Sequence, residues 1–465
     1  MNKEKRKKTN TLCDNDSDCL LSIRPMESYI STSIGKLKYN QWASLTKEQK
    51  KSVKILSDNI YNKDYFILKD IKSVGLKQTF IIYLNDGYSL VCTEDTKLKA
   101  IRDGKIIECD VKNLKEKDYL LRSYKKDYLL FPRDIKNDNI DYWYLLGCIL
   151  NGFVYTTKNN FLACKITNKN KEVLKKIELI LKSKSIKYFY KKHTIYFDAT
   201  CFSKEINNLN IRIDREVSFD ISLFDSGLFL FNKQLTENNV KSFLTSFLDF
   251  CKIDNYNNYP KIRLFLRCDK LAREIQSLFN TVGVPAKLEQ IFCTRKCFLS
   301  EKEIINENLN TSIYFTQLMA IHNLFGFDIT NIKIKEFLKH KHKTFYTSNC
   351  WNQDIPIFNK DGVVNIDENL KNYCQKNNIE PNKIQKSLIN TGMFHTTFLE
   401  FFKPKNIKYF EDELLDYIYE NQTLKTKIIK ITNGDVVECG GIVIRGNTSN
   451  ITNINDSIVS FVHKK

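Results

Sequence analysis

The same order of local structure occurs twice in this chain of 465 residues, and this repeat restricts the fold more than any other feature. Apolar periodicity in the first copy predicts a buried helix, a half-buried strand and an amphipathic helix, at 144–150, 162–166 and 173–181. The second copy predicts the same three elements at 243–248, 262–266 and 271–282. Two duplicated half-domains related by a pseudo-two-fold axis account for this order. The alternative is a chance match between ordinary α/β segments.

The region before the repeat is rich in short strands and turns. Apolar runs at 79–84 and 88–92 flank Asn85-Asp86-Gly87, and a second Asp-Gly pair stands at 103–104. An Asp-Gly pair between such runs is a strong β-hairpin signal. After a mostly helical stretch at 301–424, β character returns at 425–450. The chain is therefore expected to be a multidomain α+β protein.

The charge balance points to a polyanionic partner. The chain has 73 Lys and Arg against 54 Asp and Glu, a net charge of +19. Such an excess attracts nucleic acid or an anionic membrane surface, although a Lys-rich and Asn-rich composition alone could also produce it. No segment approaches the roughly 18 consecutive apolar residues of a membrane span. Residues 1–18 are expected to be a basic tail, either a nuclear address or simply solvated.

The cysteines indicate a reducing environment. Fourteen cysteines are scattered singly along the chain, which does not suggest a disulfide framework. The expected localisation is intracellular, without a choice among nucleus, organelle and cytoplasm.

The duplicated region resembles the LAGLIDADG homing endonucleases. Residues 145–153 and 244–252 align with the family's two motif helices, and Gly147 and Ser246 fall at the small position where these helices approach each other. Residues 268–288 also resemble the family's second repeat. The resemblance implies an αββαββα duplicated domain at 138–300, with repeats at about 138–200 and 235–300. It further implies a monomer with internal pseudo-symmetry that binds double-stranded DNA.

The resemblance also implies a metal site that this chain does not reproduce. Family members hold Mg²⁺ with a carboxylate at the eighth position of each motif, which is Gly152 in one copy and Cys251 in the other. Glycine offers no ligand, and a thiol suits a hard cation poorly. Asp249 lies two residues earlier and would point about 200° away on a helix. Asp254 could supply an acid after a loop shift. Mg²⁺ is therefore expected only if nuclease activity survives, and cleavage is expected to be impaired.

The β-rich region resembles the Hint splicing module of inteins, in two parts at 19–127 and 425–450 that the endonuclease-like domain separates. The resemblance implies a Cys or Ser nucleophile, a Thr-x-x-His motif and a terminal asparagine after a histidine. Cys19, Thr93, Asn447 and the following Thr448 are the candidates for these roles.

Both histidines of that module are replaced in this chain. Thr96 occupies the histidine position of the Thr-x-x-His motif, and Gly446 precedes Asn447. A neutral threonine cannot exchange protons near pH 7 as histidine does. Efficient splicing is therefore not expected.

Two basic strands are the best candidates for contacting DNA. In 261–267, Lys261, Arg263 and Arg267 share one strand face, opposite an apolar face. The basic and aromatic stretch at 187–197 suggests a second such strand, with Lys187, Lys191 and Lys192 as candidate DNA contacts. The alternative is an ordinary solvated strand face.

Three functional hypotheses follow. The first is a DNA-binding protein related to intein-type homing endonucleases, with site-specific double-strand cleavage as its ancestral and now impaired activity. The second is a self-processing Hint element. The third is a non-catalytic DNA-binding factor, such as a transcriptional or maturase-like protein. The role of 301–424 stays open.

Overall fold

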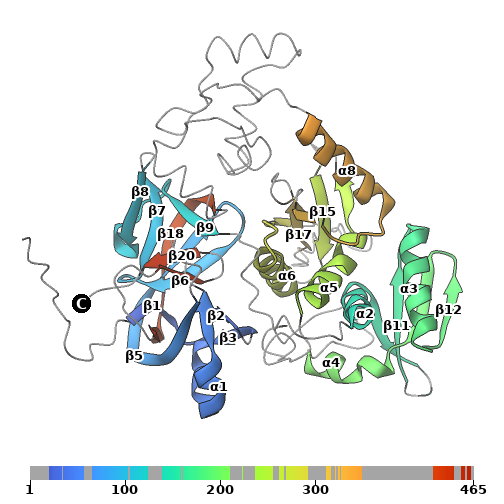
Figure 1. Cartoon of the computed structure of the whole chain (residues 1–465), viewed down its shortest axis with the longest axis horizontal. Helices are drawn as coiled ribbons and strands as arrows, with labels where there is room; N and C mark the ends of the chain where they lie inside the picture. The colour runs from blue at the N-terminus through green and yellow to red at the C-terminus, as the bar shows by residue number, and fades with distance from the viewer. Residues whose placement is uncertain are drawn as a thin grey trace, which may run out of the picture.

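The computed structural model of the chain contains a β-rich module and a duplicated α/β domain (Figure 1). The residues that it describes are 20–33, 35–56, 65–102, 105–123, 139–157, 159, 161–209, 223, 236–254, 261–266, 269–291, 310–315, 320, 323–324, 326–347, 423–444, 452–455 and 458–461. The mixed α+β composition with several antiparallel sheets agrees with the sequence-based expectation. No helix among these residues is long and apolar enough to cross a membrane.

The β module is organised around two long antiparallel strands, β5 (Tyr65–Leu84) and β18 (Thr423–Ile444). The β character predicted after residue 425 is confirmed by β18, which returns to the N-terminal sheet. Shorter strands extend this pair: β1 (Leu20–Pro25), β2 (Tyr29–Thr32), β3 (Gly35–Lys38), β4 (Lys54–Leu56), β6 (Ser89–Thr93), β7 (Lys97–Arg102), β8 (Lys105–Asp110), β9 (Tyr119–Ser123), β19 (Thr452–Asn455) and β20 (Ile458–Phe461). Short helices η1 (Tyr39–Ser44), α1 (Lys47–Ser52) and η2 (Val111–Asn113) connect them.

Both hairpins predicted in this module are confirmed by strand pairing. β5 pairs with β6 across the Asn85-Asp86-Gly87 turn, and β7 pairs with β8. The Asp-Gly pair at 103–104 lies outside the described residues. Gly87 adopts a φ of 80°, a left-handed conformation that glycine tolerates without strain.

The duplicated domain contains two halves with the same element order. The first half has α2 (Ile140–Asn151), β10 (Phe153–Thr156), β11 (Leu162–Thr167), α3 (Lys171–Ser183), β12 (Tyr188–Lys191) and β13 (Thr194–Asp198), followed by η4 (Thr200–Phe202) and α4 (Ser203–Asn208). The second half has α5 (Glu237–Asp249), β14 (Lys252–Asp254), β15 (Lys261–Leu266), α6 (Asp269–Thr281), β16 (Lys287–Ile291) and β17 (Asn310–Phe315), followed by α8 (Ile332–Thr347).

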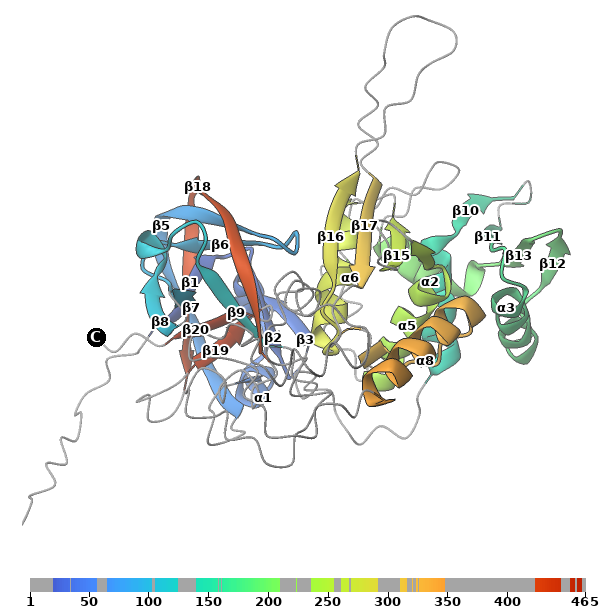
Figure 2. The same ribbon diagram turned by 90° about the horizontal axis from the view of Figure 1, so that it is seen from above.

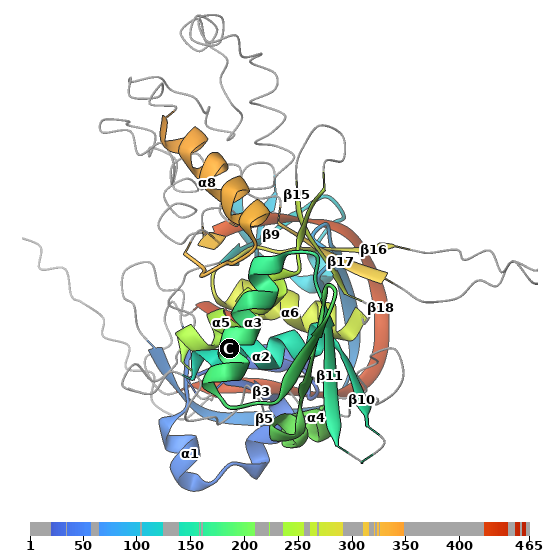
Figure 3. The ribbon, with the colours of Figure 1, turned by 90° about the vertical axis from the view of Figure 1, so that its right-hand side faces the viewer.

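The sheets of the two halves also have the same strand order. Their orders are β10-β11-β13-β12 and β14-β15-β17-β16, and every neighbouring pair is antiparallel. The helices lie on one side of the two sheets (Figures 2 and 3). Buried apolar residues of both halves form one continuous core, because α2 and α5 contribute side chains to both. The duplication expected from the periodicity is therefore present in the topology.

Two predicted boundaries differ from the structure. The second half continues beyond residue 300, since β17 completes its sheet and Leu338 of α8 is buried in the same core. The stretch at 187–197 is not one strand but a hairpin of β12 and β13. Lys192 stands in its turn with a φ of 56°, which reverses the chain before Thr194.

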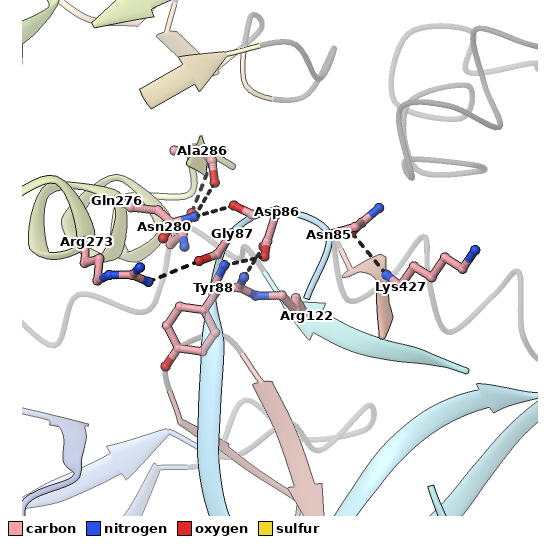
Figure 4. Close-up of polar contacts among 10 residues, drawn as sticks. All are labelled: Asn85, Asp86, Gly87, Tyr88, Arg122, Arg273, Gln276, Asn280, Ala286 and Lys427. Atoms are coloured by element: carbon pink, nitrogen blue, oxygen red, sulfur yellow. Dashed lines mark hydrogen bonds and ion pairs between the residues drawn. The ribbon is translucent and has the colours of Figure 1, made fainter. Parts of the chain in front are cut away.

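The β5–β6 turn joins the β module to the second half of the duplicated domain (Figure 4). The carbonyl oxygen of Asp86 accepts hydrogen bonds from the Leu288 amide (2.8 Å) and the Gln276 side chain (3.1 Å). Arg273 donates to the Gly87 carbonyl oxygen (3.3 Å). A Cβ atom at Gly87 would lie 2.6 Å from the Leu288 carbonyl oxygen, so this close contact requires glycine.

A buried ion pair holds the same turn from the side of the β module. The Asp86 carboxylate pairs with the Arg122 guanidinium, and both side chains are almost completely buried. The Tyr88 ring covers the guanidinium at 4.6 Å, while the Asp86 carboxylate also accepts a hydrogen bond from the Tyr88 amide. Removing one partner of such a pair leaves an uncompensated buried charge, so the ion pair stabilises the turn in this position.

Candidate nucleic-acid interface

The two halves of the duplicated domain meet along α2 and α5. Gly147 of α2 faces α5 so closely that a Cβ atom there would overlap the Ser246 Oγ and would lie 2.7 Å from the Phe243 carbonyl oxygen. The Ser242 hydroxyl of α5 donates to the Ile140 carbonyl oxygen of α2 at 2.7 Å. The expectation that Gly147 and Ser246 permit close helix packing is confirmed. This contact fixes how the two sheets are oriented relative to each other.

The residues at the eighth motif positions do not fit a magnesium ion. Gly152 ends α2, and a Cβ atom there would lie 3.0 Å from both the Cys164 Sγ and the Lys165 carbonyl oxygen, which leaves little room for a carboxylate. Cys251 is buried, and this burial, with the nearby Asp249 charge, raises the pKa of its thiol well above the usual range. Neither position therefore offers an oxygen ligand. Within the described part of the chain, no three His, Cys, Asp or Glu side chains are grouped as metal ligands.

Asp249, the first candidate acid, performs a structural role. Its side chain is fully buried and accepts hydrogen bonds from the Tyr144 hydroxyl (2.7 Å) and from the amides of Thr330 (2.7 Å) and Asn331 (2.8 Å). In return, the Asn331 side chain donates to the carbonyl oxygens of Asp249 and Cys251, each at 3.2 Å. The end of α5 and the start of α8 thus cap each other. Burial raises the pKa of Asp249, against the effect of these hydrogen bonds.

Asp254, the second candidate acid, binds a cation of its own sheet. Its carboxylate accepts a hydrogen bond from the Arg263 guanidinium at 2.7 Å, and Glu289 lies 3.8 Å from the same group. Arg263 is also stacked between the rings of Phe265 (4.4 Å) and Tyr314 (4.7 Å). These contacts hold the guanidinium in one orientation on the outer face of the sheet.

The outer face of the second sheet carries a line of cations. Residues paired directly across antiparallel strands point to the same face. Successive pairs place Lys252, Arg263, Tyr314 and Lys287 side by side across β14, β15, β17 and β16. We call these four residues the second-half row. In β15, Ile262, Leu264 and Leu266 are buried on the opposite face as predicted, whereas Phe265 is exposed on the outer face.

The equivalent line on the first sheet is mainly aromatic. Pairing places Phe153, Lys165, Tyr196 and Phe189 side by side across β10, β11, β13 and β12. We call these four residues the first-half row. The rings of Phe189 and Tyr196 are parallel, with 4.6 Å between their centroids. The opposite face packs against helices, as the hydrogen bond from the Tyr190 hydroxyl to the Leu174 carbonyl oxygen of α3 shows.

The predicted DNA-contacting lysines of the first half are all exposed. Lys187 precedes β12, Lys191 ends it, and Lys192 lies in the following turn. Lys191 pairs with Thr194 and therefore points to the same face as the first-half row. In the second half, Lys261 begins β15, but its side chain lies outside the described residues, as does the whole of Arg267.

Sequence reasoning did not identify the other members of the two rows. Lys165, Lys252 and Lys287 are ordinary lysines in short strands, and only the strand register brings them together. The aromatic residues of 187–197 were recognised, but their position beside Phe153 depends on the sheet order. The signal that could have found them is the equivalence of the two repeats once each hairpin is paired.

Two threonines of the predicted splicing motif meet at one peptide carbonyl group. The hydroxyls of Thr93 and Thr96 approach the Ile23 carbonyl oxygen of β1, at 3.4 and 2.7 Å, and lie 3.2 Å from each other. Both side chains are buried. The other splicing candidates, Cys19, Asn447 and Thr448, lie outside the described residues.

No family model and no curated protein matches this chain. Solved structures that it resembles include mesophilic variants of the homing endonuclease I-DmoI, with 12% sequence identity, coverage of 44% of this chain and 100% of the other, and a TM-score of 0.29. Another is I-DmoI in complex with DNA and Ca, with 12% identity, the same coverage and a TM-score of 0.28. At such low identity and TM-score, these resemblances assign no function to this chain.

Proposed function

We propose that the duplicated domain binds double-stranded DNA as a monomer, through the outer face of its second-half sheet, and that its motif positions no longer support cleavage. The observation that carries this proposal is the second-half row, in which three cations, Lys252, Arg263 and Lys287, stand on one face of β14, β15 and β16. Four adjacent strands span about 14 Å, similar to the roughly 12 Å width of the DNA major groove.

The row combines two kinds of DNA contact. Lys252 is exposed and suits a phosphate, since a flexible ammonium contacts phosphate as a point charge. Arg263 is held by Asp254 and two rings, so its guanidinium is pre-oriented for a base edge or a phosphate. The carboxylates of Asp254 and Glu289 compete with DNA for Arg263, which favours selective rather than very tight binding.

The absence of oxygen ligands at Gly152 and Cys251 is the reason for proposing that cleavage is impaired. Mg²⁺ requires oxygen ligands in octahedral geometry. Asp249 cannot serve as one of them, because its buried carboxylate already accepts hydrogen bonds from the amides of Thr330 and Asn331. Incubation with a library of long duplex DNA and Mg²⁺ tests this part. Defined double-strand cuts would contradict it.

Salt-dependent binding tests the DNA proposal itself. Binding of fluorescent duplex DNA should weaken as salt rises, and Lys252→Ala/Lys287→Ala should reduce the slope of log K against log salt by up to about 1.8. The matched control is Lys333→Ala/Lys339→Ala, which removes the same charge from exposed positions of α8, on the helix side of the domain (Figure 2). Absence of salt-sensitive binding, or equal effects of both variants, would refute the proposal.

A second candidate function is self-processing by the β module. The convergence of the Thr93 and Thr96 hydroxyls on the Ile23 carbonyl oxygen favours it, because two hydroxyls polarise a single peptide bond. It ranks second because neither threonine can exchange protons near neutral pH. Mass spectrometry of the purified chain decides: fragments cut within or next to β1 would support processing, and an intact chain would count against it.

A further inference from the structure

We propose that the first-half sheet binds unpaired bases of a DNA strand next to the duplex that the second half holds. The chain would then recognise a junction between double-stranded and single-stranded DNA. This inference rests on the proposed DNA-binding function and names the form of DNA that the two halves prefer.

The two rows differ in chemistry although they occupy the same place in the two sheets. Pairing aligns Phe153 with Lys165 in the first half and Lys252 with Arg263 in the second. At the outermost strand, Phe189 stands where the second half has Lys287. The second-half row therefore consists of three cations and one buried ring, whereas the first-half row consists of three rings and one cation. A duplicated surface that contacted the same duplex symmetrically would be expected to keep the same charge on both sides.

The rings of the first-half row are arranged so that a base can stack on them. Phe189 is 58% exposed, and its ring lies parallel to that of Tyr196. A base that stacks on the free side of Phe189 would continue this parallel pair. Phe153 is half-buried and stacked with Tyr155 of the same strand, with 6.2 Å between centroids. Aromatic platforms of this kind bind unpaired bases with little sequence preference, because every base has a π face.

Cations stand among these rings at positions suited to a phosphate backbone. Lys165 is exposed in the middle of the row, between Phe153 and Tyr196. Lys191 is exposed at the edge of the same face. Alternating rings and lysines are complementary to a single DNA strand, which exposes both bases and phosphates. They suit an apolar protein partner poorly, because the lysines would be buried without a counter-charge. In a duplex the base faces are covered by neighbouring bases, so these rings would have nothing to stack on.

The two rows can contact one nucleic acid. The strands of both halves lie on the same side of α2 and α5 (Figure 2), and the close contact at Gly147 fixes the two sheets relative to each other. A duplex on the second-half row would extend toward the first-half row. A duplex with an unpaired arm would therefore contact both surfaces, with the duplex on the second-half row and the arm on the first-half row.

Fluorescence anisotropy with two DNA probes tests the inference. One probe is a blunt duplex, and the other is the same duplex with an unpaired arm of about eight nucleotides. The full-length chain should bind the armed probe about tenfold more tightly than the blunt one. Phe189→Ala/Tyr196→Ala should abolish this preference and leave blunt-duplex affinity unchanged. Phe189→Leu, which keeps an apolar side chain but removes the ring, should reduce the preference without unfolding the sheet.

Matched controls separate the possible results. Tyr83→Ala removes another exposed aromatic side chain, in the β module, and should leave the preference unchanged. Equal binding of both probes by the wild-type chain would overturn the inference and leave the proposed function intact, whereas failure to bind the blunt duplex would refute the proposed function. An RNA arm that binds more tightly than the DNA arm would overturn the assignment to DNA. Self-association that the Phe189 variants abolish would identify a second copy as the occupant and would also overturn it.

Discussion

Gly147→Ala is expected to destabilise the duplicated domain, although alanine is the better helix former. The added Cβ would overlap the Ser246 Oγ and would lie 2.7 Å from the Phe243 carbonyl oxygen, whereas ordinary contacts begin at 3.4 Å. The backbone oxygen cannot rotate away, so α2 and α5 must separate by roughly 0.7 Å. Overpacking of this kind costs about 2–3 kcal/mol.

The net effect follows by subtracting the gain in helix propensity. Replacing glycine with alanine in a helix contributes about 1 kcal/mol, which leaves a net loss of roughly 1–2 kcal/mol. For a domain of about 200 residues this corresponds to a fall in Tm of roughly 2–8 °C. Scanning calorimetry of the full chain should show the fall in the transition of the duplicated domain.

A double-mutant cycle tests the assigned cause. Ser246→Ala removes the overlapping Oγ, so Gly147→Ala/Ser246→Ala should regain part of the lost stability. Gly326→Ala is the control, because a Cβ there would meet only the Asn323 carbonyl oxygen at 3.5 Å. The reasoning is refuted if Gly147→Ala melts at or above the wild-type temperature, or if Ser246→Ala gives no recovery.

Three further predictions concern the other contacts. Asp249→Ala should lower the free energy of unfolding by at least about 3 kcal/mol, because it leaves buried donors unpaired; urea titration measures this, and unchanged stability would contradict the structural role. Gly87→Ala should detach the β module from the second half, since its Cβ would meet the Leu288 carbonyl oxygen. Faster proteolysis between the two parts checks this, and an unchanged rate would count against it. Burial acts to raise the pKa of Asp118, but hydrogen bonds from Arg102 and a backbone amide lower it below 3.8. The stability of the β module should therefore fall as pH drops from 3.8 through this lower pKa, and Asp118→Asn should remove that dependence in acid unfolding curves.

Local periodicity was sufficient to predict the repeated helices and central strands. The apolar residues of the helix at 144–150 and the alternating residues of the strand at 262–266 lie within one short segment each. The buried face of each element can therefore be predicted from neighbouring residues alone. β17 was missed because residues 292–309 separate it from β16, so no hairpin signal marks it. Helical content was therefore assigned to a segment whose first described element is a strand.

The roles of single polar residues were harder to predict, because their partners are remote in sequence. Asp249 looked like a displaced catalytic acid, but its amide partner Asn331 lies 82 positions further along the chain. Arg263 was recognised as a surface cation, whereas its carboxylate and ring partners appear only when the strands are paired. The charge of such a residue can be read from the sequence, but its ion-pair and ring partners are determined by the register of the sheet.

The pairing of β5 with β18 has a consequence for how the chain folds during synthesis. Leu84 of β5 pairs with Ile428, so the duplicated domain is made between the two strands. At about 5–20 residues per second, β5 waits roughly 20–70 s for its partner strand to be synthesised. The duplicated domain is complete in this interval, and its second half offers the β5–β6 turn a docking site before β18 arrives. The β module therefore closes last, and a long strand edge is exposed to aggregation until it does.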